Sequence, residues 1–358
     1  MIMGVADCLG RLDLSIIIGS FNLYKFKGES NKKSAKNLKM IAKIIKNEGF
    51  DIIALQEVFN DKQLKVIPKS IVNYLGEDYE CIWQPTHGYI ESYTEGYAFI
   101  WNTKKFRQIG MEDGELYKRH RAKKKLVRPP LMARFIPRSI SENGFIELRL
   151  ITTHMIFNKP PKESGTDTEF RRKELKVLTE EIYPDIADDR YGNNRPAYTI
   201  LMGDYNLCLT KTPRLDDEVD KTAGFFEKAI PNSRIPILNL KKRIVVTRQN
   251  ELTSLKRPPK DLPSTENYDV DIESDSEEIM ENNSSDYYSK DYDHFSYDEE
   301  RFDGVKVVIS RVDALRKYYN NRLDDYRREI SDHVPIKIEI DLRGEGLYGR
   351  FNSIRRTN

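Results

Sequence analysis

The sequence has few cysteines and no long hydrophobic segment, and both absences limit the class of protein. Its 358 residues include three cysteines, an odd number without metal-ligand spacing, so a secreted disulfide framework is not indicated. The apolar run at residues 14–19 is far too short for a membrane span or the core of a signal peptide. We therefore expect a soluble, cytoplasmic protein with no membrane partner.

The chain also lacks a strong charge of either sign. Its 59 lysines and arginines nearly balance its 57 aspartates and glutamates, which leaves a formal net charge of +2 at pH 7. Net charge therefore says little about partners, and any attraction to a polyanion must come from local clusters. The apolar fraction of 39% is enough to build a core, and no internal repeat is present. We interpret residues 1–358 as a single domain with insertions.

Apolar runs and a periodic helix alternate along the first part of the chain. Residues 14–19 are continuously apolar and end at polar residues, as in a strand that is buried on both faces. A helix with its apolar face at Leu38, Ile41 and Ile45 follows, and residues 51–55 are a second buried strand. Because several later strands follow one another directly, the pattern predicts an α/β fold with mixed sheets. These strands are expected at 79–83, 97–101, 132–136, 145–153, 198–202, 305–309 and 336–340, with helices near 169–182 and 312–328.

Three segments differ from the rest of the chain in composition. Residues 119–128 are a dense basic run. Residues 258–291 are acidic, rich in serine, asparagine and tyrosine, and poor in aliphatic residues, so we expect a mobile insertion there instead of a second core. Such an insertion could shield a site, recruit a protein partner or be inert. Residues 343–358 form a basic C-terminal tail.

Short polar motifs lie at the ends of the predicted strands, and their residue types suit the hydrolysis of phosphate esters. Glu57 follows a buried strand, where a carboxylate is well placed to hold Mg²⁺ or Mn²⁺. A glutamate that caps a loop would give the same motif. Asp204 could activate a water molecule, and the amide of Asn206 could hold a phosphate oxygen. Alternation would aim both side chains the same way if the strand continued, whereas an Asx turn is the alternative.

Two histidines complete the candidate site. His154 ends a predicted strand, and an imidazolium there could stabilise negative charge that develops on phosphorus, or act as an acid. A lone histidine at a strand end is more often structural, so the companion motifs support this role. Asp332 and His333 are adjacent and cannot pair across one strand face, so Asp332 fits a metal and His333 fits the scissile phosphate. An upstream carboxylate must then orient His333, and Asp293 is the candidate.

In this order, the motifs resemble those of the endonuclease/exonuclease/phosphatase superfamily. The similar segments are Ser-Phe-Asn-Leu, Leu-Gln-Glu-Val, Gly-Asp-x-Asn, Tyr-Asp-His and Ser-Asp-His, and the resemblance covers nearly the whole chain as one catalytic domain. It implies a deoxyribonuclease I-like fold, which is a four-layer sandwich. In that fold, two packed mixed β-sheets carry helices on both outer faces.

The resemblance also implies which residues hold the metal and the phosphate. Asn22 would help to organise both of them, and Glu57 and Asp332 would bind the metal. Arg128, in Val-Arg-Pro-Pro, looks like the phosphate-contacting arginine of the family. Asn206 matches the asparagine of the Gly-Asp-x-Asn motif, which binds a phosphate oxygen.

Each catalytic histidine would have its own carboxylate partner. Glu95 looks like the glutamate that pairs with His154, and Asp293 looks like the aspartate that orients His333. A second candidate, Asp313, lies in an Arg-x-Asp segment that resembles the abasic-site endonucleases. We prefer Asp293, because the Tyr-Asp-His-Phe segment is more similar to the nuclease-like members.

The motifs and the resemblance together predict an Mg²⁺- or Mn²⁺-dependent hydrolase of phosphodiester bonds, and we favour a nuclease that cuts DNA. Lys123, Lys124 and Lys125 could follow a nucleic-acid backbone without reading its sequence, although a solvated loop is an equal alternative. A phosphoesterase acting on inositol phosphates or sphingomyelin would use the same centre. A non-catalytic scaffold would lack site residues, and every expected residue type is present. The motifs favour no particular strand form or oligomeric state.

Overall fold

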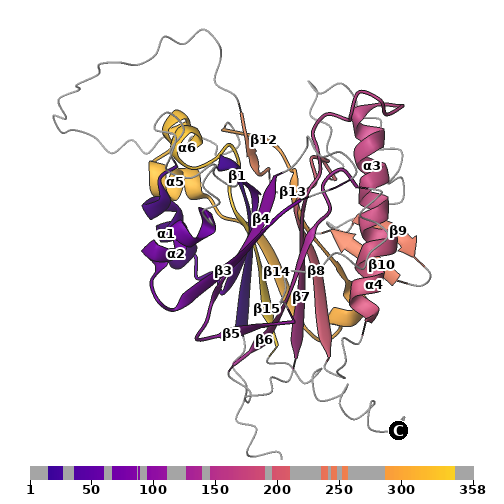
Figure 1. Cartoon of the computed structure of the whole chain (residues 1–358), viewed down its shortest axis with the longest axis horizontal. Helices are drawn as coiled ribbons and strands as arrows, with labels where there is room; N and C mark the ends of the chain where they lie inside the picture. The colour runs from indigo at the N-terminus through magenta and orange to yellow at the C-terminus, as the bar shows by residue number, and fades with distance from the viewer. Residues whose placement is uncertain are drawn as a thin grey trace, which may run out of the picture.

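The computed structural model shows two β-sheets with helices on their outer faces (Figure 1). The predicted tail at 343–358 and most of the acidic segment at 258–291 lie outside the residues that it describes, as do Lys123, Lys124 and Lys125. The described residues are 15–26, 36–59, 67–86, 88, 95–110, 126–138, 146–189, 196–209, 235–240, 243–247, 252–256 and 287–342.

The first sheet has six strands in the order β14-β15-β1-β2-β4-β3. β1 and β2 run parallel and α1 (Leu38–Asn47) connects them, so the predicted strand–helix–strand unit is confirmed. The helix begins after Asn37, whose side chain accepts a hydrogen bond from the backbone N–H of Met40. The strands are β1 (Ser15–Phe26), β2 (Ile52–Val58), β3 (Tyr79–Pro85), β4 (Gly96–Asn102), β14 (Lys306–Arg311) and β15 (Ile336–Asp341), and α2 (Ile67–Leu75) lies beside α1.

The second sheet has seven strands in the order β5-β6-β7-β8-β13-β10-β9. β7 and β8 run parallel, and their connection contains α3 (Asp167–Val177), a π-helical turn (Leu178–Ile182) and α4 (Tyr183–Asp188). A capping box of Thr166 and Glu169 begins α3. The strands are β5 (Phe106–Ile109), β6 (Leu131–Pro137), β7 (Glu147–His154), β8 (Ala197–Asp204), β9 (Ile235–Leu240), β10 (Arg243–Thr247) and β13 (Asp293–Asp298).

Alternating side chains on the central strands define four layers. In the first sheet, Ile52 packs between the two sheets, whereas its neighbour Ile53 packs against the α1 and α2 side. In the second sheet, Ile200 faces the layer between the sheets and Leu201 faces the α3 and α4 side. Both faces of these strands are therefore covered, which explains their continuous apolar sequences. The predicted four-layer α/β sandwich is confirmed.

The helix predicted near 312–328 is divided into two helices. α5 (Ala314–Tyr319) ends at Asn320, and α6 (Leu323–Glu329) follows after two residues with positive φ angles. The φ angles of Asn320 and Asn321 are 48° and 63°, in the left-handed region that asparagine tolerates better than most residues. The single long helix in that prediction is therefore wrong.

The end of the predicted acidic insertion is regular structure. Within 258–291, β12 (Tyr288–Lys290) pairs with β11 (Ser254–Leu255), and Asp291 is buried. Residues 288–291 are therefore not part of a mobile insertion, contrary to the prediction. Among the described residues, no helix is both long and apolar enough to cross a membrane.

The strand directions bring the predicted motifs to one edge of the sandwich. β1 and β2 carry Asn22 and Glu57 near their carboxyl ends, and β7 and β8 end at His154 and Asp204, which are opposite each other in the register. β13 runs antiparallel to β8 and begins at Asp293, opposite Asp204. Residues from both sheets therefore meet where these strands end.

Candidate active site

Asp204 lies at the centre of the candidate site. Its Oδ2 atom accepts a hydrogen bond of 2.9 Å from Asn22 Nδ2, and it lies 3.6 Å from the Nε2 atoms of both His154 and His333. The aspartate is 1% exposed. Burial raises the pKa of Asp204 to about 6, although the charges of the two imidazoles oppose that rise. A carboxylate with this pKa is a stronger base than an aspartate in water.

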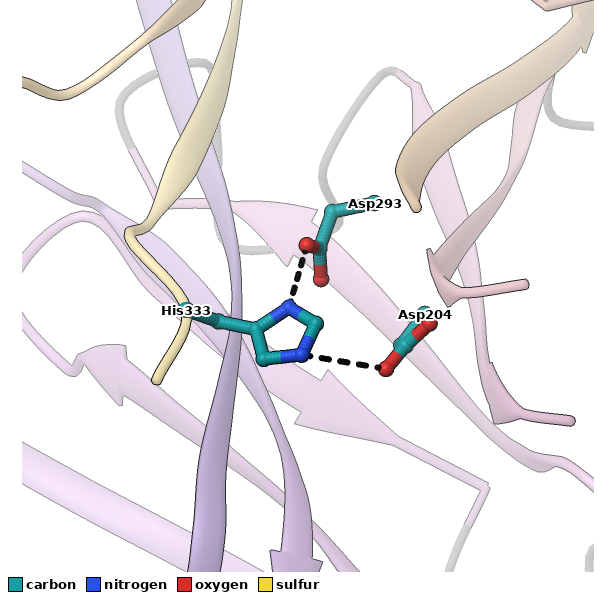
Figure 2. A group of neighbouring side chains, drawn as sticks. All are labelled: Asp204, Asp293 and His333. Carbon is teal, nitrogen blue, oxygen red and sulfur yellow. Dashed lines mark hydrogen bonds and ion pairs between the residues drawn. The ribbon is translucent and has the colours of Figure 1, made fainter. Parts of the chain in front are cut away.

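His333 has its own carboxylate partner on the side away from Asp204. The Nδ1 atom of His333 lies 2.7 Å from Asp293 Oδ2, as Figure 2 shows. Burial lowers the pKa of His333, but the Asp293 and Asp204 carboxylates together raise it well above its usual value. Asp313 instead caps α5 by accepting a hydrogen bond from the backbone N–H of Arg316. The geometry therefore favours Asp293 over Asp313 as the partner.

His154 forms a second pair of the same kind. Its Nδ1 atom lies 2.8 Å from Glu95 Oε1, and Arg128 Nη1 lies 3.1 Å from Glu95 Oε2. Arg128 Nη1 is also 3.0 Å from His154 Nδ1, but an Nδ1 that donates to Glu95 cannot accept from the guanidinium. The contact between Arg128 and Glu95 is therefore the favourable one. Burial lowers the pKa of His154, and the Glu95 and Asp204 carboxylates outweigh that effect and raise it.

Asn22 connects the two sheets inside the site. Its amide nitrogen donates to Asp204 Oδ2 and also to Glu57 Oε1, at 3.1 Å, and its Oδ1 accepts from the backbone N–H of Tyr24. The second oxygen of Glu57 accepts from the backbone N–H of Lys25. Burial raises the pKa of Glu57, but the charge of His154 and these hydrogen bonds lower it overall. The glutamate is therefore ionised, and Asn22 holds it beside Asp204.

The carboxylates fit a hard divalent cation. Within the described part of the chain, Asp332 Oδ1 is buried and has no hydrogen-bond partner, which leaves a lone pair for a ligand. The described residues contain one group of three His, Cys, Asp or Glu side chains that is close enough to share an ion, and it consists of Asp204, Asp293 and His333. Glu57 and Asp332 do not belong to this group. His333 already contacts Asp293 and Asp204 through its two ring nitrogens, and Glu57 and Asp332 remain the metal ligands that the sequence predicts.

The Ser-Asp-His loop is fixed by contacts that the sequence analysis did not identify. Ser331 Oγ donates to the Asn22 carbonyl at 2.6 Å and accepts from the backbone N–H of His333. Tyr326 donates to the His333 carbonyl, and a bridge to Ser254 of β11 holds the other side of the loop. The loop is therefore attached to both β1 and β11. In the sequence, only the serine of the Ser-Asp-His motif indicated that other elements hold this loop.

Asn206 does not continue the strand. Its φ angle is 49°, and its backbone N–H donates to Asp204 Oδ1 in an Asx turn. Its side-chain amide donates to the Met155 carbonyl at 2.7 Å. Of the two possibilities that the sequence left open, a continued strand and an Asx turn, the structure has the Asx turn. Asn206 instead fixes the loop after β7, directly beyond His154.

Glu174 of α3 is a further buried group beside the site that sequence reasoning missed. It accepts a hydrogen bond of 2.9 Å from the backbone N–H of Val127 and so holds the segment that carries Arg128. Burial raises the pKa of Glu174 to about 7, against the opposing effects of the Val127 N–H and the Arg128 charge. A glutamate on the buried face of a helix does not indicate from sequence that it holds the segment carrying Arg128.

The glycine of the Gly-Asp-x-Asn motif is required by the backbone. Gly203 has a φ angle of +139°, and a Cβ atom there would overlap the Thr153 carbonyl oxygen. Gly203→Ala is expected to lower the free energy of unfolding by about 3 kcal/mol, measured by chemical denaturation. Gly76→Ala is the control, because Gly76 also has positive φ but has nothing within 4 Å of the added atom. Equal losses in the two variants would contradict this explanation.

The layers and the strand order are those of the four-layer, deoxyribonuclease I-like fold. No protein-family model and no curated protein matches the sequence. Among solved structures, ANGEL2, a 2′,3′-cyclic phosphatase, is similar over 92% of this chain and 96% of its own, with 14% sequence identity and a TM-score of 0.50. At this identity, the similarity establishes the fold alone.

Two further structures show similar coverage. An endonuclease/exonuclease/phosphatase family protein from Bacteroides thetaiotaomicron has 16% identity and a TM-score of 0.45, over 92% of this chain and 99% of its own. Truncated Caenorhabditis elegans TDP2 has 16% identity and a TM-score of 0.42, over 92% of this chain and 98% of its own.

Proposed function

We propose that the protein is a divalent-metal-dependent phosphodiesterase that hydrolyses nucleic acid. The observation that carries this proposal is the position of Asp204 between two imidazoles. One aspartate oxygen lies 3.6 Å from Nε2 of both His154 and His333. Each histidine has a buried carboxylate on its other ring nitrogen. This arrangement can accept one proton at its centre and present two positive charges around it.

Asp204 is the base in this proposal. A water molecule beside its carboxylate gives up a proton to Asp204 as the water oxygen bonds to phosphorus. The raised pKa of Asp204 brings its basicity closer to that needed near neutral pH. Asn22 donates to the same carboxylate oxygen and keeps it directed at the space between the imidazoles.

The two histidines stabilise the negative charge that develops on the phosphoryl oxygens. The Glu95 carboxylate raises the pKa of His154 and the Asp293 carboxylate raises the pKa of His333, which favours the protonated form of both rings. One imidazolium can then give its Nε2 proton to the leaving oxygen as the phosphorus–oxygen bond breaks. Arg128, which is held by Glu95, is available for a non-bridging phosphate oxygen.

Glu57 and Asp332 are the residues that would hold the cation, with Asn22 as their organiser. Their oxygen atoms suit Mg²⁺ or Mn²⁺, and the buried Asp332 Oδ1 has no hydrogen-bond partner in the described part of the chain. A cation bound there would supply positive charge to the phosphate.

Nucleic acid is the preferred substrate because the positive charges in and around the site suit a polyanion. The basic run at 119–128, which contains Lys123, Lys124 and Lys125, ends at the site residue Arg128. Similarity to ANGEL2 adds a second candidate, a 2′,3′-cyclic phosphate at the end of a nucleotide, which is also a phosphodiester. Phospholipid and inositol phosphate substrates remain the alternatives for the same centre.

A panel of substrates tests the proposal. Circular, linear and single-stranded DNA, RNA, a 2′,3′-cyclic nucleotide, an inositol phosphate and sphingomyelin are each incubated with Mg²⁺, Mn²⁺ or EDTA. We expect plasmid nicking with either metal, no product in EDTA, and full recovery when metal is restored. Release of phosphocholine or inositol-bound phosphate without nucleic-acid cleavage would contradict the choice of substrate. Cleavage that is unchanged in EDTA would contradict the metal dependence.

A further inference from the structure

Lys36 is a buried cation that the proposed chemistry does not use. It lies just before α1, and its side chain is 8% exposed. Among the described residues, no hydrogen bond or ion pair to its ammonium group is found, although Asp332 and Glu57 are near enough to act on it electrostatically. Burying a charged group without a bonded partner is unfavourable. A lysine held in this way indicates that an anion contacts it when the site is occupied.

The backbone around Lys36 is fixed beside α6. The neighbouring residue Asn37 donates through its backbone N–H to the Glu329 carbonyl at 2.8 Å and through its side chain to the Glu329 carboxylate. Arg327, on the same helix, lies 3.8 Å from Asp332 and donates to the carbonyls at the end of β11. The backbone next to Lys36 is therefore held against α6, the helix that carries Arg327.

A second lysine shares an aromatic ring with Lys36. The ammonium groups of Lys25 and Lys36 lie 5.0 and 5.5 Å from the centre of the Tyr24 ring. Tyr24 and Lys25 have φ angles of 42° and 53°, which are uncommon for residues other than glycine. Asn22 and Glu57 hold this turn, because they accept hydrogen bonds from the two backbone N–H groups. Asn22 and Glu57 of the candidate site therefore place Lys25 and the Tyr24 ring that Lys36 also contacts.

A divalent cation bound to Glu57 and Asp332 would make the surroundings of Lys36 more positive. Glu57 and Asp332 are the nearby negative groups, and Lys25, Lys36 and Arg327 are the nearby positive ones. A divalent cation on the two carboxylates would neutralise them and leave the three basic side chains without compensation. The scissile phosphate lies toward Asp204 and the histidines in the proposed function, so these basic groups face a different part of the substrate.

We propose that Lys36 and Lys25, positioned by Tyr24, form an anion subsite for a second phosphate group of the substrate. This inference rests on the proposed function. The second phosphate has two sources with the same chemistry, which are the next phosphate along a nucleic-acid strand and a phosphate at the strand end. The subsite would raise affinity for substrates with more than one phosphate over simple diesters.

Binding to short thymidine oligonucleotides tests the subsite. TpT has one phosphate, TpTpT adds an internal phosphate and pTpT adds a terminal one. Affinities are measured in Mg²⁺ by calorimetry, with Asp204→Asn in every protein so that the ligands stay intact. We expect the protein with Lys36 to bind TpTpT, pTpT or both about tenfold more tightly than TpT, as one charge-assisted contact allows. Lys36→Gln should abolish that preference, and Lys36→Arg should keep most of it.

Two other variants control this experiment. Lys43→Gln removes an exposed lysine from α1 and should keep the full preference. Lys25→Gln changes an exposed side chain, so it tests the subsite even if Lys36→Gln does not fold, and it should reduce the preference severalfold. If the lysine variants lose only the preference for pTpT over TpT, the subsite binds a terminal phosphate. If they lose only the preference for TpTpT over TpT, it binds an internal phosphate.

Two results would overturn the inference. One is that both Lys36→Gln and Lys25→Gln retain the preference for ligands with two phosphates over TpT. The other is that Lys36→Gln lowers the affinity equally for all three ligands, which would place Lys36 at the scissile phosphate. Hydrolysis of TpT by the wild-type protein is measured separately. Its absence would contradict the proposed function without affecting the binding comparison.

Discussion

Asp204→Asn is expected to lower kcat for phosphodiester hydrolysis by about 10³-fold, because it removes the proposed base. The asparagine side chain has the same shape and can still contact Asn22 and the imidazoles, so the fold and substrate binding should be retained. Its amide cannot take a proton from water, and it no longer supplies negative charge to the two histidines. Steady-state kinetics with Mg²⁺ on the best substrate of the panel measures the effect.

Asp298→Asn is the matched control for this variant. Asp298 is also a buried aspartate and lies at the other end of β13, where it caps a short 3₁₀ helix through the backbone N–H of Glu300. The same chemical change there should leave kcat within about twofold of wild type, because residues at distant sites act independently of each other. Wild-type turnover by Asp204→Asn would contradict the central role of this residue.

Asp293→Asn is expected to lower kcat by about 10²-fold and to change the dependence of the rate on pH. The wild-type rate should rise with pH as Asp204 loses its proton, at an apparent pKa of about 6. It should fall at higher pH as an imidazolium loses its proton. The pKa of His333 is raised because Asp293 and Asp204 stabilise the protonated form. Removal of the Asp293 charge therefore lowers that pKa, and the alkaline fall should begin at lower pH.

Measurement of kcat/KM for the wild-type protein and Asp293→Asn between pH 5 and pH 10 tests this expectation. The same pair affects stability, since a histidine with a raised pKa stabilises the folded state at low pH. That stabilisation is fully present below the pKa of an unfolded histidine, about 6.5, and is lost as pH rises through the folded value. If kcat/KM of the wild-type protein and of Asp293→Asn falls at the same alkaline pH, His333 does not control that fall.

Much of the fold was visible in the sequence because buried strands keep a simple pattern. The apolar runs at 14–19 and 51–55 correspond to β1 and β2, which are covered on both faces. β13 was missed because its sequence has no such pattern. It buries His294 and Ser296, and the Leu207 carbonyl contacts the Nε2 atom of the histidine while the Tyr205 hydroxyl contacts the serine hydroxyl. Polar partners of this kind come from other strands and leave no local sign.

The edge of the second sheet was missed for another reason. β9 contains Pro236, which normally argues against a strand, but β9 is the last strand of its sheet. An edge strand tolerates proline because one side of its backbone is not paired within the sheet. The division between α5 and α6 depends on the φ angles of Asn320 and Asn321, and the periodicity of the surrounding residues continues across them.

The site residues were easier to predict than their contacts. Motif order was enough to suggest that Asp204, His154 and His333 act together, and the structure brings them within 3.6 Å. The choice between Asp293 and Asp313 required coordinates, because both follow short motifs of similar character. Lys36 could not have been found from sequence, since its position depends on the hydrogen bonds between its neighbour Asn37 and Glu329 of α6.

The role of Asp204 and of the metal is measured by hydrolysis of nucleic acid by the wild-type protein and Asp204→Asn, run side by side with Mg²⁺ and with EDTA. We expect metal-dependent cleavage by the wild-type protein, which the chelator abolishes and added metal restores, and cleavage about 10³-fold slower with the asparagine variant. Equal rates for the two proteins, or a rate that the chelator does not change, would contradict this expectation.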